Sequence, residues 1–175
     1  MDFSILYAIQ NLRCEFMDSF ILVLTKLAGS YGQIWLILAV VLLIFKKTRK
    51  CGAAMILSYL LVYLIGHLWL KDLIARPRPC HIDTNLELIV SRPSSYSCPS
   101  THSAWSFAAA ASVFMFSRKY GLITGIAALL IAFSRMYLFV HFPSDVLFGA
   151  VLGIVFGIIS ALLVNLVWSK FKKTE

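Results

Sequence analysis

The chain has 175 residues, of which 60% are hydrophobic and only 14% are charged, and its mean hydropathy is +0.84. This composition excludes an ordinary soluble domain, and the length suffices for about six membrane-crossing helices. A net charge of +8 raises the question of nucleic acid. The basic residues stand in short runs beside apolar segments, without an aromatic-basic binding module, so we expect a lipid bilayer and no nucleic acid as the partner.

Hydrophobic periodicity predicts an all-α integral membrane protein. Residues 1–12 have apolar side chains at helical spacing but are too few to cross a bilayer, so we expect a short N-terminal helix at the interface. We treat residues 1–175 as one domain, with an active-site loop at about residues 71–102. Six apolar runs are predicted to be transmembrane helices: residues 16–28, 33–45, 51–69, 103–116, 121–139 and 144–168.

Basic residues predict the orientation of these helices. They collect at residues 46–50, at residues 118–119 and at Lys170, Lys172 and Lys173. Alternating helices place all three groups on one side, which the positive-inside rule makes cytoplasmic. We therefore expect a multi-pass protein of the bacterial plasma membrane, with its remaining polar segments facing outward.

Three polar islands interrupt the apolar chain: residues 71–79 (KDLIARPRP), 99–102 (PSTH) and 134–145 (SRMYLFVHFPSD). Buried or membrane-level charge is costly and tends to mark function, and these islands place charged residues at the ends of apolar segments. Cleavage of a phosphate ester needs a nucleophile, a proton donor and fixed positive charge. The three islands contain histidines for the first two roles and lysine or arginine for the third.

The third island suggests how a nucleophile is oriented. His141 and Asp145 are four residues apart across a helix-to-helix corner at Pro143, so the carboxylate can hold one imidazole nitrogen and leave the other free to attack. His102 is then available as the acid. Residues 100–103 open an apolar helix, whose backbone N–H groups can receive a phosphate.

These islands resemble the three motifs of the type 2 phosphatidic acid phosphatase superfamily, K-x6-R-P, P-S-G-H and S-R-x5-H-x3-D. The first and third match completely, and the second has Thr101 where the family has glycine. A side chain at that position must point away from the phosphate. The resemblance implies that His141 forms a phosphohistidine, that Asp145 orients it and that His102 protonates the leaving group and later activates water. It also implies a phosphate-binding set made of Lys71, Arg78, Ser100, Thr101 and Arg135.

The resemblance further implies a metal-independent lipid phosphatase without a cofactor. We expect it to hydrolyse undecaprenyl diphosphate to the monophosphate at the outer face of the membrane. Phosphatidylglycerophosphate or phosphatidic acid is the alternative substrate, and an anionic-lipid transporter is the alternative from another class. A metal site is a further alternative, without a recognised ligand spacing; its ligands would be His81, Asp83, His102 and His141.

Several residues outside the fixed positions of the motifs have simpler interpretations. His67 stands one helical turn before Lys71, and we interpret it as a buried, hydrogen-bonded residue rather than a neighbour of the site. Arg76 and Arg92 are interpreted as solvated loop charges or lipid-headgroup contacts. The small-residue face formed by Gly149, Gly153 and Gly157 permits close helix approach, and we favour packing inside the bundle over a dimer.

The cysteines suggest a covalent cross-link between the two ends of the outer loop. Cys80 follows the first island and Cys98 precedes the second, so we predict a disulfide between them, which in the chain-entropy model is worth about 3 kcal/mol. The alternative is two free thiols buried at the interface. Cys14 and Cys51 are expected near the cytoplasm, where thiols stay reduced.

Overall fold

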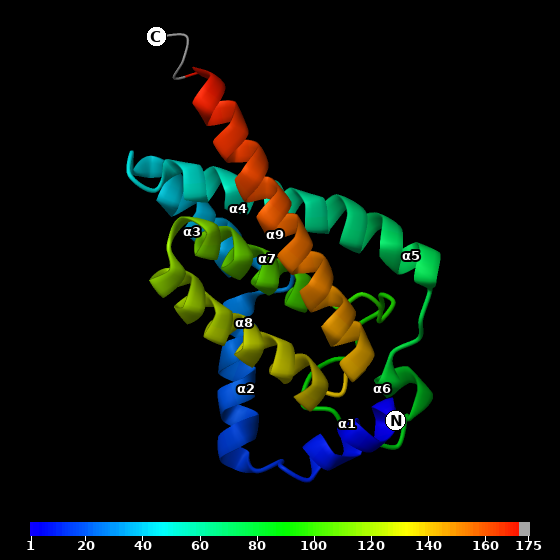
Figure 1. Cartoon of the computed structure of the whole chain (residues 1–175). Coiled ribbons are helices and arrows are strands. Elements are labelled where there is room, and N and C mark those ends of the chain that lie inside the picture. Colours follow the sequence, from blue (N-terminus) through cyan, green and yellow to red (C-terminus); the bar gives the residue numbers. More distant parts are fainter. Residues whose placement is uncertain (172–175) are drawn as a thin grey trace.

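The computed structural model describes residues 1–171, which contain helices and no strand (Figure 1). The predicted all-α class is thus confirmed over these residues. Two of the basic residues used to predict orientation, Lys172 and Lys173, lie outside the described part of the chain.

The N-terminal quarter folds as a short helix followed by a bent pair. α1 (Asp2–Gln10) precedes α2 (Glu15–Ala28) and α3 (Gln33–Ile44), and the axes of α2 and α3 differ by 49°. The turn between them has positive φ at Gly29 (69°) and Gly32 (64°), a conformation that glycine adopts without steric cost. The turn brings the C-terminal end of α2 over the site described below.

The second part is one continuous rod. α4 (Arg49–Leu61) runs into a π-helical segment, η1 (Val62–Leu70), and then into α5 (Lys71–Ile74), as Figure 1 shows. π-Helical segments are rare and occur frequently at functional sites, because the wider turn changes the side-chain register. The rod ends at Ala75, whose φ of 48° is left-handed, and the short α6 (Pro79–Ile82) follows.

The core is built around α7 (Thr101–Phe116), which packs against α4, α8 (Arg118–Tyr137) and α9 (Pro143–Phe171). α7 is rich in alanine and serine, so its neighbours can approach its backbone closely. A methyl group added at Gly153 of α9 would lie 2.2 Å from the carbonyl oxygen of Ala104. This contact confirms the prediction that the glycine face of α9 packs inside the bundle.

The predicted number of spans is supported only in part. Each of the six predicted segments is helical, but only residues 49–82, 118–137 and 143–170 are long and apolar enough to cross a membrane singly, and the bent α2–α3 pair would be a fourth. α7 has 16 residues, fewer than the roughly 20 needed for a hydrocarbon core. It lies inside the bundle, where a shorter helix with irregular ends is tolerated beside a polar cavity. The structure supports an integral membrane protein and does not confirm six separate spans.

Helix ends from distant parts of the chain meet at the site. The start of α5, the start of α7 and the linker between α8 and α9 lie together, and the loop of residues 83–100 covers them. The α3–α4 and α7–α8 connections lie at the left of Figure 1, away from this group. All three polar islands therefore belong to one end of the bundle.

Candidate active site

A polar cavity of about 650 Å³ lies where these helix ends meet. Its walls come from the α2–α3 turn, the end of η1, residues 90–95 and the linker after α8. Six of the eight residues predicted for the site line this cavity: Lys71, Arg78, Thr101, His102, Arg135 and His141. The other two, Ser100 and Asp145, are fully buried behind the wall.

Three buried cations face this cavity, and each is held by neutral groups. Lys71 Nζ donates to the carbonyl oxygen of Tyr96 at 2.7 Å. Arg78 Nε donates to the carbonyl oxygen of Ser95 at 2.7 Å. Arg135 Nη2 donates to the Thr25 hydroxyl at 2.7 Å.

None of the hydrogen bonds described for these three cations is to a carboxylate. Burying a charge is expensive unless it is compensated. The cavity therefore has a strong preference for an anion, and the guanidinium groups match the geometry of phosphate oxygens.

His141 is buried in the wall beside Arg78. Its Nε2 accepts a hydrogen bond from Arg78 Nη1 at 3.0 Å, since a guanidinium can only donate. Arg78 Nη1 also donates to the Val140 carbonyl at 2.8 Å, which fixes the guanidinium over the imidazole. Burial and the positive charge of Arg78 lower the pKa of His141 well below its usual range, so the ring is neutral and the electron pair of Nε2 accepts the hydrogen bond from Arg78.

Asp145 lies behind His141 but is not hydrogen-bonded to it. His141 Nδ1 and Asp145 Oδ2 are 3.9 Å apart. The Ser97 hydroxyl lies between the two side chains, donating to Asp145 Oδ2 at 2.5 Å and approaching His141 Nδ1 at 3.4 Å. In this geometry Ser97 links the carboxylate to the imidazole.

His102 stands at the first turn of α7 and lines the same cavity. Its Nε2–H donates to the Gly29 carbonyl at 2.9 Å, so the α2–α3 turn sets the orientation of the ring. Ser100 caps the same helix, and its N–H donates to the Asp145 carbonyl at 3.1 Å. This backbone bond ties the start of α7 to the start of α9, and the backbone N–H groups at the first turn of α7 can bind an anion.

Thr101, which replaces the family's glycine, is buried and lines the cavity. The expected outward orientation of its side chain stays a prediction. The residue adds bulk at the helix start where the phosphate is expected.

Sequence reasoning missed three contributors to this site. Ser95 and Ser97 belong to a serine-rich stretch of the loop, which was a visible but non-specific signal. The interpretation of Arg76 as a solvated charge is wrong, because it forms ion pairs with Asp145 and Asp2. Arg92 is exposed, as expected of a loop charge, and it also donates to the carbonyl oxygens of residues 80, 84 and 86 within the loop.

His67 lines the cavity instead of lying apart from it. Its ring stacks on Tyr63 and contacts Tyr31 and Trp105. Within the described residues its Nδ1 has no hydrogen-bond partner, so the expectation of a hydrogen-bonded ring is not met at this atom.

The predicted disulfide is absent, and Cys80 and Cys98 are both free thiols. Cys80 is buried in an apolar cluster with Leu6 and Phe139, and so it serves as a small core residue. Burial and the neighbouring Asp145 carboxylate raise the pKa of Cys98 to about 11, which keeps its thiol protonated.

The alternative metal site also finds no support in the geometry. Among residues 1–171, no group of three or more histidine, cysteine or acidic side chains could hold a metal ion. The four residues considered for it, His81, Asp83, His102 and His141, do not form such a group.

A helical membrane protein with two histidines and three buried cations around one cavity has the arrangement of a membrane phosphatase. Residues 49–169 match the PAP2 superfamily, and the chain belongs to this family. The matched segment contains all three polar islands. The resemblance seen in the motifs is therefore confirmed.

Relatives with known names are consistent with this class. A protein named undecaprenyl-diphosphatase from Sulfolobus acidocaldarius is 34% identical over 128 residues, which are 71% of this chain and 62% of that protein. The matched region thus spans less than two thirds of that relative's length.

Two solved structures share the fold. The crystal structure of Aquifex aeolicus LpxE has a TM-score of 0.71 and 30% identity, covering 91% of this chain and 93% of that one. The crystal structure of a transmembrane PAP2-type phosphatidylglycerolphosphate phosphatase from Bacillus subtilis has a TM-score of 0.70 and 27% identity, covering 97% of this chain and 85% of that one. Together the family and its relatives support a lipid phosphatase embedded in a membrane.

Proposed function

We propose that this lipid phosphatase hydrolyses undecaprenyl diphosphate to the monophosphate, through a phosphohistidine formed on His141. The observation that carries the proposal is the group of three buried cations, without a carboxylate among their hydrogen-bond partners, that faces one cavity with His141 and His102. An anionic phosphate is the ligand that compensates these charges.

In the first half-reaction the terminal phosphate binds Lys71, Arg78 and Arg135. Arg78 then donates to a phosphate oxygen, and its hydrogen bond to His141 Nε2 is released for the attack. The Nε2 electron pair forms the N–P bond as the P–O bond to the leaving group breaks. His102 enters this step as an imidazolium, which the bound phosphate anion stabilises, and becomes neutral as it gives its proton to the leaving oxygen.

In the second half-reaction water replaces the departed lipid. His102, now the base, accepts a proton from the water as its oxygen attacks phosphorus, and the N–P bond breaks to release inorganic phosphate. The positive charge that developed on the His141 ring is stabilised by Asp145 through Ser97. Fixed protein cations supply the charge stabilisation at each step, so we expect activity without a metal or other cofactor.

The choice of substrate is supported by the relative named undecaprenyl-diphosphatase. The orientation is supported by the basic segments at residues 46–50 and 118–119, which lie away from the cavity and favour an outward-facing site in a bacterial plasma membrane. Phosphatidylglycerophosphate is the second candidate, favoured by the Bacillus subtilis structure. We retain six transmembrane helices with an interfacial α1, in one domain of residues 1–175, as part of this proposal.

A substrate panel tests the proposal. Purified protein in detergent should release phosphate faster from a polyprenyl diphosphate than from phosphatidylglycerophosphate or phosphatidic acid. His141→Ala should release none, and acid-labile, base-stable phosphate should be trapped on the wild-type protein and absent from the variant. A higher rate with phosphatidylglycerophosphate would make the second candidate correct, and absence of phosphate release from every lipid would favour a transporter.

A further inference from the structure

Asp145 is a fully buried carboxylate whose oxygens are both occupied. Oδ2 accepts hydrogen bonds from the Ser97 hydroxyl at 2.5 Å and from the Phe142 N–H at 2.9 Å. Oδ1 accepts from Arg76 Nη1 at 2.6 Å. His141, at 3.9 Å, is the most distant of these four neighbours. The orientation of Asp145 is therefore set largely by Arg76, Ser97 and the Phe142 backbone, none of which is a fixed position of the three motifs.

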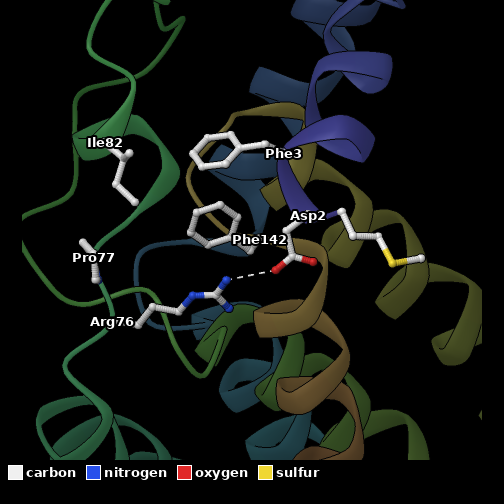
Figure 2. Close-up of a pocket in the computed structure, with 7 residues that line it drawn as sticks. Asp2, Phe3, Arg76, Pro77, Ile82 and Phe142 are labelled. Carbon is white, nitrogen blue, oxygen red and sulfur yellow. Dashed lines mark hydrogen bonds and ion pairs between the residues drawn. The ribbon is translucent and has the colours of Figure 1, made fainter.

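Arg76 holds Asp145 and the N-terminal helix at once. While Nη1 contacts Asp145, Nη2 donates to Asp2 Oδ2 at 2.9 Å, across 74 residues of chain. The guanidinium carbon lies 4.1 Å from the centre of the Phe142 ring, and Figure 2 shows the Arg76 side chain reaching toward Asp2 beside this ring. The planar guanidinium group directs its two terminal nitrogens at two different carboxylates, and the single ammonium group of a lysine cannot reproduce this geometry.

The arginine also fixes the serine that links Asp145 to the imidazole. The carbonyl oxygen of Arg76 accepts a hydrogen bond from the Ser97 N–H at 2.8 Å. The side chain and the backbone of Arg76 thus act on both sides of Asp145. Movement of Arg76 would shift Asp145 and Ser97 together, and with them the support behind His141.

Asp2 anchors the far side of the guanidinium. Its Oδ2 also accepts from the Ser144 hydroxyl at 2.5 Å. These hydrogen bonds, first from Ser144 and then from Arg76, hold the pKa of Asp2 below its ordinary value despite partial burial. α1 is therefore tied to the segment that carries Asp145, next to an open pocket of about 620 Å³ (Figure 2).

We propose that Arg76 is a positioning residue for the phosphohistidine chemistry: it fixes Asp145 behind His141, and Asp2 of α1 holds Arg76 in the orientation that this requires. The ion pair with Arg76 also supplies Asp145 with a cation of its own. Because Asp145 is paired with Arg76, it does not pair with Lys71 or Arg78, and the charges of these two residues remain available to the phosphate. This inference rests on the proposed role of His141 as the nucleophile.

Kinetics of Arg76→Ala and Arg76→Lys test the inference. We expect the alanine variant to lose kcat roughly 10- to 100-fold, with KM little changed. Losses of this size occur in metalloenzymes when a residue that hydrogen-bonds to a metal-binding side chain, and so orients it, is mutated. The lysine variant keeps the charge but not the planar guanidinium group, so its kcat should lie between the alanine variant and the wild type. If the alanine variant does not fold, the lysine variant carries the same comparison.

Arg13→Ala is the matched control. Arg13 forms a similarly exposed ion pair with Asp18, at 3.2 Å, but contacts no residue of the site. Its kcat should equal that of the wild type. A kcat within twofold of the wild type for Arg76→Lys and Arg76→Ala, or a loss confined to KM, would overturn the positioning role.

Double-mutant cycles separate positioning from a general structural effect. If Arg76 acts through Asp145, removing Arg76 should cost little further kcat in an Asp145→Asn background. Asp2→Ala should reduce kcat less than Arg76→Ala and should have no effect once Arg76 is absent. Additive losses in both cycles would refute the inference. Failure of the underlying chemistry is recognised separately, because His141→Ala would then retain activity.

Discussion

The close contact between α7 and α9 predicts that adding a single methyl group at Gly153 will disturb the packing of the two helices. In Gly153→Ala the new Cβ would lie 2.2 Å from the Ala104 carbonyl oxygen, whereas Cβ atoms essentially never approach another heavy atom within 3.0 Å. The neighbouring atom belongs to the backbone and cannot rotate away. The helices must therefore separate by about 0.8 Å at this point.

This separation should reach the active site. α9 begins at Pro143, about three turns before Gly153. Its first turn holds Asp145, whose carbonyl accepts from the Ser100 N–H at 3.1 Å. Overpacking of this kind costs about 1–3 kcal/mol of stability. A displacement near 1 Å at a catalytic group lowers the rate roughly 100-fold. We expect kcat/KM of Gly153→Ala to fall by about 10- to 100-fold, together with a lower Tm.

The chain offers a matched control in Gly125→Ala. Gly125 also lies within a helix, but a Cβ there meets no heavy atom within 4 Å. The substitution should leave phosphate release unchanged and stabilise α8 by up to about 1 kcal/mol. Phosphate release from a short-chain polyprenyl diphosphate and thermal unfolding in detergent are the two measurements. Wild-type activity and Tm for Gly153→Ala would show that the two helices are not in this contact.

The remaining predictions concern the chemistry and the topology. Asp145→Asn should retain the imidazole of His141 but hold it poorly, lowering kcat about 100-fold or more in steady-state assays; an unchanged rate would show that the carboxylate is dispensable. Burial and Arg78 lower the pKa of His141, so activity should persist below pH 6.5, where an ordinary imidazole becomes protonated. Arg78→Ala removes part of this effect and raises the pKa of His141, so the acid limb of the residual pH–rate profile should move to higher pH; an unmoved limb would contradict this coupling. Activity should survive exhaustive treatment with EDTA, whereas loss that an added divalent ion restores would favour a metal site. In intact cells a membrane-impermeant thiol reagent should label a cysteine placed at Asp83 and not one placed at Thr48, and the reverse pattern would invert the protein.

Local sequence is sufficient to propose the chemistry of this protein. The spacing of His141 and Asp145 around a helix corner, and the start of an apolar helix at Ser100, are enough by themselves to indicate a phosphate site. Hydrophobic composition similarly indicates a helical membrane protein. These features depend on residue type and on short spacings, which a helix converts directly into geometry.

Tertiary structure alone decided how the site is supported. Arg76 meets Asp2 across 74 residues, and Arg135 meets Thr25 across 110. The number of spans is not settled by composition for the same reason, because apolarity does not distinguish a helix buried against other helices from one that faces lipid. Such contacts depend on how the helices pack against one another. A periodic sequence pattern specifies which face of a helix is buried, but it does not specify which side chain of another helix contacts that face.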